Sequence, residues 1–218
     1  MNVMLGRRLF ADRAAAGRAL VGQLERERGQ ELVVVGLARG GVEVAAEVAR
    51  ALDAPLDVVA VRKIGHPFQP EYAIGAVTPG DGVYVRAPDG LTDEELTAVV
   101  EETRAKAALL DRRLHAEHPA VDLHGRTVLL IDDGLATGAT MIAAARWAKA
   151  AGADRVVVAV PVAAAASLPF LRHEADDIVV LYPLAQFSSV GAWYDSFAQV
   201  GDADVIRLIA ASRGRPSD

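Results

Sequence analysis

The sequence predicts an α/β fold, built on a doubly wound and mainly parallel sheet with flanking helices. Short apolar runs of strand length alternate along the chain with longer stretches of helical period, a pattern typical of a parallel sheet. The apolar runs are rich in valine and lack a polar face, as expected for strands covered on both sides. The chain has 218 residues, 52% of them hydrophobic, so we expect one sizeable core and a single domain over residues 1–218.

Residues 10–61 contain two predicted helix–strand units. An amphipathic pattern over residues 10–28, with leucines one turn apart on one face, predicts a helix. Apolar runs at 31–37 and 56–61 predict buried strands. A glycine turn separates the first of these strands from a helix expected at 42–52.

The middle of the chain is less regular. Residues 64–70 contain two prolines and a glycine, so an irregular loop is expected there. Residues 72–77 and 82–85 alternate like the two strands of a hairpin. Thr92 begins a capping box, which predicts the start of the clearest helix, and Pro119 marks its end.

The most informative segment follows this helix. The apolar run 128–131 predicts a buried strand, and it stops at two acids, Asp132 and Asp133. A loop of small and hydroxyl residues at 134–140 then leads into an alanine-rich helix expected at 141–151. Free backbone N–H groups in such a loop favour a bound phosphate, and the acids can accept hydrogen bonds from vicinal hydroxyls. A ribose diol beside a 5′-phosphate satisfies both halves of the segment.

The C-terminal part continues the alternation of strands and helices. The elements expected there are a strand at 155–160, a helix at 163–174, a strand at 177–181 and a helix at 203–211.

Two further candidate sites follow the first two strands, because open α/β sheets bind ligands beyond the carboxyl ends of their strands. After the first strand, Gly40 and Gly41 let the backbone approach an anion and Arg39 adds a cation. A plain turn with a surface arginine is the alternative. After the second strand, Arg62 and Lys63 form a cation pair that could neutralise phosphate oxygens, with solvated charge at a strand end as the alternative.

Segment 128–141 resembles the phosphoribosyl pyrophosphate signature of type I phosphoribosyltransferases, an apolar run and two acids followed by Thr-Gly-x-Thr. It lacks the lysine of a Walker loop and the glycine spacing of a dinucleotide fingerprint. An ordinary strand–helix turn with acids capping the helix is the alternative. The resemblance implies that Asp132 and Asp133 hold the ribose hydroxyls. The loop residues that it implies for the 5′-phosphate are Gly134, Leu135, Ala136, Thr137, Gly138, Ala139 and Thr140.

The same resemblance assigns the other parts of the site. It implies that the Arg39 loop binds pyrophosphate, with Lys63 as the first choice for a further phosphate contact. It also implies a flexible loop near 64–71 and a small hood near 186–201 that covers the acceptor. Among the aromatic residues of that hood, Trp193 is the best candidate to stack on a flat ring, with a subunit contact as the alternative.

One position departs from a branch of the family. The hypoxanthine–guanine enzymes carry an acid just before the Thr-Gly of the signature, whereas this chain has Ala136. The wording Ala-Thr-Gly is closer to the adenine and uracil branches. The residue that handles the proton of the acceptor is therefore unassigned.

The resemblance implies transfer of a 5-phosphoribosyl group from phosphoribosyl pyrophosphate to a nitrogenous acceptor, a nucleobase or a related compound, with release of pyrophosphate. Mg²⁺ would be bound mainly through the substrate, so no metal site made of protein ligands alone is expected. Two other functions fit the same pocket, a non-catalytic ribose-phosphate sensor and a hydrolase of a phosphorylated sugar.

The composition of the chain limits the classes of partner and metal site that we expect. A net charge of −6 argues against an extended nucleic-acid interface. The absence of cysteine excludes disulfides, thiolate zinc sites and a cysteine nucleophile, and it suits the cytoplasm. No targeting segment and no bilayer-spanning run is visible, so no membrane partner is expected, whereas a homodimer is left open. No acidic third metal ligand is obvious beside His115 and His118, so these residues are interpreted as a solvated helix end.

Overall fold

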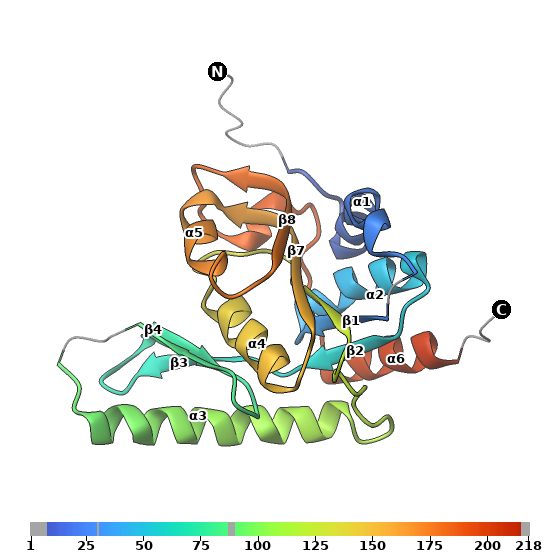
Figure 1. Ribbon diagram of the computed structural model, residues 1–218. Coiled ribbons are helices and arrows are strands. Elements are labelled where there is room, and N and C mark those ends of the chain that lie inside the picture. The colour runs from blue at the N-terminus through green and yellow to red at the C-terminus, as the bar shows by residue number, and fades with distance from the viewer. Residues whose placement is uncertain (1–7, 30, 87–89, 215–218) are drawn as a thin grey trace.

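The computed structural model describes residues 8–29, 31–86 and 90–214 (Figure 1). A five-stranded sheet in the order β2-β1-β6-β7-β8 forms its centre, and every neighbouring pair is parallel. This arrangement confirms the predicted α/β class with a mainly parallel sheet. Its strands are β1 Leu32–Leu37, β2 Leu56–Val59, β6 Thr127–Ile131, β7 Arg155–Ala164 and β8 Asp177–Leu184.

Helices cover both faces of the sheet because alternate strand residues point to opposite sides. Val34, Leu129 and Val157 pack beneath one helical layer, whereas Val35, Leu130 and Val158 pack beneath the other. The first layer holds α1 Arg13–Leu24, α2 Gly40–Leu52 and α6 Asp202–Arg213, and the second holds α4 Ala139–Ala150 and α5 Leu168–Leu171. A short 3₁₀ turn, Glu25–Glu27, follows α1.

A second, antiparallel sheet of three strands leaves the main body as an arm (Figure 1). Its strands are β3 Arg62–His66, β4 Gln69–Val77 and β5 Val83–Val85. The long helix α3 Asp93–Leu114 lies along this arm, and its capping box at Thr92 is formed as predicted. The apolar residues of the arm make a small separate core around Ile64, Ile74 and Val77. Within the described part of the chain, no helix is long and apolar enough to cross a membrane.

The expectation of an irregular loop over residues 64–70 is wrong. Residues 64–66 belong to β3 and residues 69–70 to β4, so only the turn between them is free of strand structure. Pro67 lies in that turn, and β4 tolerates Pro70 because the ladder shifts register at Gly65, which pairs with Ala73, whereas His66 pairs with Gln69. Pro70 therefore stays out of the regular ladder, the position in which a proline costs least.

The helix expected at 163–174 is also wrong in extent. Strand β7 continues to Ala164, a 3₁₀ turn covers Ala165–Ser167, and α5 spans only Leu168–Leu171. The alanines at this point pair with β8 as far as Leu184. Pairing with a neighbouring strand thus outweighs the intrinsic preference of alanine for helix.

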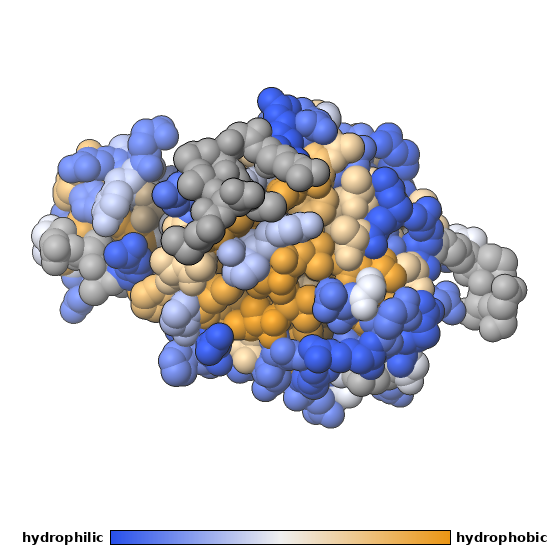
Figure 2. All heavy atoms as spheres, turned by 90° about the horizontal axis from the view of Figure 1, so that it is seen from above, coloured by the Kyte–Doolittle hydropathy of each residue, from blue (hydrophilic) through white to orange (hydrophobic). Residues whose placement is uncertain are grey.

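Hydrophobic residues are gathered on the upper face of the molecule. Figure 2 shows them in the middle of the view, with hydrophilic residues around them. Strand β8 is an outer strand of the sheet, and Phe170 of α5 and Tyr182 of β8 expose 62% and 38% of their surface. The Tyr182 ring contacts Phe10 edge-on at 5.8 Å between centroids, so β8 packs there against the segment that precedes α1.

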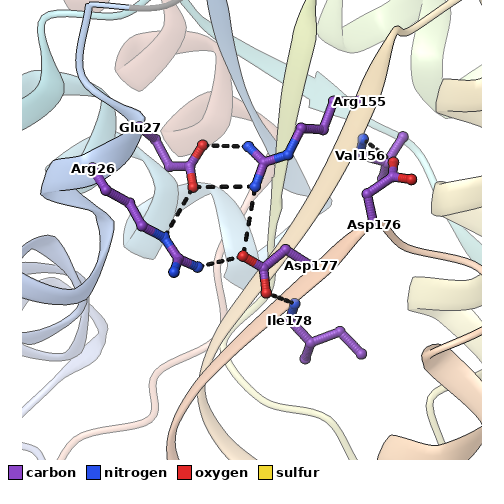
Figure 3. A network of polar contacts seen from close by, with 7 residues as sticks. All are labelled: Arg26, Glu27, Arg155, Val156, Asp176, Asp177 and Ile178. Carbon is purple, nitrogen blue, oxygen red and sulfur yellow. Dashed lines mark hydrogen bonds and ion pairs between the residues drawn. The ribbon is translucent and has the colours of Figure 1, made fainter.

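Ion pairs tie together the amino edge of the main sheet (Figure 3). Arg155 at the start of β7 pairs with the buried Glu27 and lies 3.5 Å from Asp177 at the start of β8. Arg26 completes the network through Glu27 at 3.2 Å and through Asp177. Because the strands are parallel, this network lies at the edge opposite their carboxyl ends.

His115 does not form a solvated helix end. Its side chain is only 11% exposed, with Nε2 lying 3.0 Å from Oδ1 of the buried Asp57 and Nδ1 lying 3.4 Å from Oδ2 of Asp111. Hydrogen bonds to Asp111 and Asp57 raise the pKa of His115 to about 10. The other Asp57 oxygen accepts the backbone N–H of Val121 at 2.7 Å, so the cluster joins α3, β2 and the loop before β6.

We expect His115→Gln to lower the free energy of unfolding by about 2 kcal/mol at pH 6, the scale of hydrogen bonds to a charged group. Because folding raises the pKa of His115 from 6.5 to about 10, its contribution is complete below pH 6.5 and is lost as the pH rises to about 10. Urea unfolding from pH 6 to pH 10 checks this. A difference between wild type and variant that stays constant over this range would contradict the assignment.

Candidate functional site

The candidate site lies where the strand order reverses. The chain runs from β1 to β2 on one side and returns to β6 on the other, so β1 and β6 are neighbours, with Gly36 paired to Ile131. Crevices beyond the carboxyl ends of such strands are the usual ligand sites of open α/β sheets. The loop after β1 and the loop after β6 therefore lie side by side. They bring together the two segments that the sequence singled out, residues 39–41 and 132–140.

Two glycines allow these loops to touch. A Cβ added at Gly41 would lie 2.6 Å from the carbonyl oxygen of Ile131 and 3.0 Å from Oδ1 of Asp132. A Cβ added at Gly40 would overlap Oδ2 of Asp133 and would lie 2.9 Å from Nε of Arg13. The sequence suggested these glycines for close approach to an anion, which stays a prediction, and the structure shows that they make room for the acid pair.

The acid pair is held in a demanding electrostatic environment. Burial raises the pKa of Asp132 well above its ordinary value, and the neighbouring charge of Asp133 raises it further. Burial likewise raises the pKa of Asp133, whereas a hydrogen bond from Arg13 lowers it. The backbone N–H of Asp133 donates to Oδ1 of Asp132 at 2.8 Å, and Nε of Arg13 donates to Oδ2 of Asp133 at 2.7 Å. Lys63 adds a positive charge near Asp132, which lowers the pKa of that carboxyl.

The loop after the acids is anchored to β7. Leu135 exchanges backbone hydrogen bonds of 2.9 and 2.8 Å with Val162 and Ala164, and the Ser167 hydroxyl donates to the carbonyl of Ala136. Gly138 has φ +81°, a left-handed conformation that suits glycine, and it starts the twelve-residue helix α4 at Ala139. The loop therefore presents the N-terminus of a full helix beside the exposed Thr137, the arrangement that favours a bound anion.

The predicted cations reach the same crevice from different elements. Arg39, which follows the cis peptide bond Ala38–Arg39, donates through Nε to Oδ1 of Asp202 at 2.7 Å. Lys63 is exposed on β3. The Nε of Arg62 is buried and has no hydrogen-bond partner within the described ranges.

A cavity of about 630 Å³ joins these cations to the hood segment, which we define as residues 186–201. Its lining residues are Arg13, Ala38, Arg39, Gly40, Val61, Arg62, Lys63, Leu110, Phe197, Ala198, Gln199 and Val200. The aromatic residue of this lining is Phe197, not Trp193. Trp193 instead packs beside Phe187, with 6.3 Å between ring centroids, and its carbonyl accepts backbone hydrogen bonds from Leu9 and Phe10.

Arg13 was missed in the sequence, and Tyr194 and Phe197 were recognised only as aromatic residues of the hood. Arg13 bonds to Asp133, the Tyr194 hydroxyl donates to the backbone carbonyl of Asp133 at 2.6 Å, and Phe197 stacks against Arg13. Burial raises the pKa of Tyr194, so the phenol stays a neutral donor. A local signal for Arg13 existed only in Asp12, whose side chain caps the helix that Arg13 begins. Its contact with Asp133, 120 residues away, has no local signature.

We expect Gly40→Ala to weaken ribose 5-phosphate binding by about tenfold or more, because the added Cβ displaces a carboxylate that carries charge-assisted hydrogen bonds. Isothermal titration with ribose 5-phosphate measures the effect. The matched control is Gly22→Ala in α1, where an added Cβ has nothing within 4 Å. The control should bind normally and gain about 0.5–1 kcal/mol of stability. Equal affinity in the two variants would contradict the packing of Gly40 on Asp133.

Comparison with known proteins places this geometry in a family. The family model "Phosphoribosyl transferase domain" matches residues 9–186. The Mycobacterium tuberculosis H37Rv protein named "Putative phosphoribosyl transferase Rv0571c" is 42% identical over 207 residues, which cover 93% of this chain and 46% of that protein. The corresponding protein of strain CDC 1551 gives the same values, so this chain spans about half the length of these curated relatives.

A solved structure extends the comparison to three dimensions. The protein TT1426 from Thermus thermophilus is 40% identical, has a TM-score of 0.80, and is matched over 98% of its own length and 93% of this chain. The family match includes both loops of the crevice and ends at residue 186, where the hood segment begins. On these grounds the chain belongs to the phosphoribosyl transferase domain family.

Proposed function

We propose that this protein transfers a 5-phosphoribosyl group from phosphoribosyl pyrophosphate to a nitrogenous acceptor, a nucleobase or a related compound, and releases pyrophosphate. The observation that carries this proposal is the junction at the strand reversal, where an acid pair, a helix N-terminus and a cationic cavity adjoin. An acid pair suits a ribose diol, the helix N-terminus suits a 5′-phosphate, and the cations suit pyrophosphate.

The residue roles follow from this placement. Asp132 and Asp133 would accept hydrogen bonds from the ribose hydroxyls. Residues 134–140 would bind the 5′-phosphate through the N-terminus of α4. Arg39, the amide of Gly40, Arg62 and Lys63 would hold the pyrophosphate, because they line the adjoining cavity, and the amide of Gly41 follows Gly40 in the same loop.

Arg39 would have to exchange its partner when pyrophosphate binds. Its guanidinium is engaged by Asp202, which also lies 3.3 Å from Arg113. Because Asp202 keeps this second cation, it remains paired when Arg39 turns to a phosphate. Pyrophosphate binding would in this way change the ion pairs of Asp202, the first residue of α6.

Mg²⁺ would enter this site as a substrate-bound ion. Within residues 8–29, 31–86 and 90–214, no group of three or more histidine, cysteine or acidic side chains could hold a metal. Pyrophosphate and ribose oxygens would hold Mg²⁺, a hard cation that prefers oxygen ligands and retains several waters. When bound, the ion would neutralise charge on the leaving pyrophosphate.

The chemistry asked of the protein is positioning and charge stabilisation. Departure of pyrophosphate leaves an oxocarbenium-like ribose, and buried carboxylates near the ring favour that positive charge. Holding the acceptor nitrogen in line with the departing group lowers the entropic part of the barrier. No covalent intermediate with the protein is required.

The acceptor would enter beside the hood segment. Phe197 is 39% exposed on the cavity wall, so we place it on the acceptor side in preference to Trp193. The hairpin of β3 and β4 starts at Arg62 and Lys63, and it corresponds to the flexible loop expected near 64–71. Its ordering by ligand remains a prediction, and so does a homodimer.

Two variants test the role of the acid pair. We expect Asp132→Asn combined with Asp133→Asn to lower ribose 5-phosphate affinity at least about a hundredfold, because two charge-assisted acceptors are lost. Calorimetric titration at pH 8 measures this loss. Asp154→Asn, an exposed acid at the opposite edge of the sheet, is the matched control and should bind as wild type does. Unchanged affinity in the double variant would remove the acids from the site.

Turnover separates the proposal from its two alternatives. Pyrophosphate release from phosphoribosyl pyrophosphate is measured with Mg²⁺, with and without a panel of nucleobases and related amines. We expect release that depends on one acceptor. Release without any acceptor would indicate a hydrolase, and tight binding with no release under any condition would indicate a sensor.

A further inference from the structure

Arg13 is the buried cation of the site. It is the first residue of α1, and Asp12 before it caps the helix by accepting the Ala15 N–H at 2.7 Å. Its surface is only 7% exposed, and an arginine is rarely buried so deeply unless it is paired. The cap fixes the direction in which the helix starts, so the side chain of Arg13 enters the crevice instead of solvent.

The guanidinium of Arg13 uses its donors on separate elements. Nε donates to Oδ2 of Asp133 at 2.7 Å, at the end of β6. Nη1 donates to the backbone carbonyl of Ala198 at 2.7 Å, in the hood segment. Its Cζ lies 3.8 Å from the centre of the Phe197 ring, a cation–π contact. One planar group thus fixes the second acid and the cavity wall together.

We propose that Arg13 is a positioning residue, which holds the carboxylate of Asp133 in the orientation that accepts a ribose hydroxyl. Because it holds Ala198 and Phe197 with the same group, it also sets the distance between the ribose end and the acceptor end of the site. This inference rests on the proposed function, because it assumes that Asp133 receives ribose.

The surroundings of Asp133 make a fixed cation necessary. Asp132 lies beside it and carries a like charge, and the Tyr194 hydroxyl donates to the backbone carbonyl of Asp133. The positive charge of Lys63 lowers the pKa of Asp132. Glu43 of α2 faces Arg13 from 3.6 Å and competes for its charge. Of these groups, Arg13 is the cation that hydrogen-bonds the Asp133 carboxylate, and it keeps the pKa of that carboxyl lower than burial alone would.

Arginine suits this role better than lysine. Its planar fork can satisfy Asp133 and Ala198 from fixed directions, whereas an ammonium is a point charge on a flexible stem. Arg13→Lys should therefore keep part of the attraction for Asp133 and lose the contact with the hood segment. Arg13→Met keeps the buried apolar stem and loses all charge.

The experiment compares two ligands in four proteins. Wild type, Arg13→Lys, Arg13→Met and Arg155→Met are titrated separately with ribose 5-phosphate and with Mg²⁺–pyrophosphate. Arg155→Met is the matched control, because it also breaks an ion pair with a buried acid, Glu27, at the far edge of the sheet (Figure 3). Thermal unfolding of each protein shows how much stability every substitution removes.

We expect Arg13→Met to lose about tenfold or more in ribose 5-phosphate affinity, the cost of one charge-assisted hydrogen bond. It should lose less than about threefold for pyrophosphate, because Arg13 lines the cavity with Nε and Nη1 already donated to Asp133 and Ala198. Arg13→Lys should fall between Arg13→Met and wild type. Arg155→Met should lower the unfolding temperature without changing either affinity. Equal losses for both ligands in Arg13→Met would overturn the positioning role, as would ribose 5-phosphate binding equal to wild type.

A pH profile adds a readout that a purely structural role would not move. Ribose 5-phosphate binding needs ionised Asp133, so affinity falls as the pH drops through the pKa of that group. Removing Arg13 raises this pKa, so the acid midpoint of Arg13→Met should lie at higher pH than in wild type, whereas Arg155→Met should keep the wild-type midpoint. An unmoved midpoint in Arg13→Met overturns the inference. If wild type itself binds neither ligand, the proposed function fails and the inference fails with it.

Discussion

Two neighbouring carboxylates at the end of β6 impose the constraint around which the site is built. Side by side and partly buried, they repel each other, and burial raises the pKa of both carboxyls. A backbone N–H donates a hydrogen bond to the Asp132 carboxylate, and the Arg13 guanidinium donates one to the Asp133 carboxylate. The glycines after β1 leave room for these interactions. A side chain at either glycine would collide with the acid pair, so the close packing of the two loops and the pairing of the acids depend on each other.

The three-stranded sheet of the arm positions two cations at the cavity beside the main sheet. Strand β3 begins at Arg62 and Lys63, at the cavity, and then leaves the body of the molecule (Figure 1). The long helix α3 packs on the arm and returns to the main body, where His115 binds the buried Asp57 of β2. The positions of the two cations are thus set by an arm that is fixed at both ends.

The sequence predicted local structure well wherever the signal was local. The valine-rich runs became the parallel strands, Thr92 and Glu95 formed their capping box, and the acids and glycines of two loops met at the strand reversal. It failed where tertiary pairing decided. Two prolines indicated a loop at 64–70, yet a register shift at Gly65 accommodates Pro70 within a hairpin. Alanines after residue 162 indicated a helix, yet β8 draws them into the sheet.

By itself, the sequence determined the fold class, the place of the acid pair before an anion loop, and the chain positions of the cations. These follow from periodicity and from short motifs whose chemistry is contained in a few adjacent residues. Only the tertiary structure decided that Arg13 reaches Asp133, that Phe197 and not Trp193 lines the cavity, and that His115 lies between two acids. Each of these contacts joins segments far apart in the chain or depends on how a helix end is rotated. Neither the spacing nor the composition of residues carries that information, because it arises only when the layers pack.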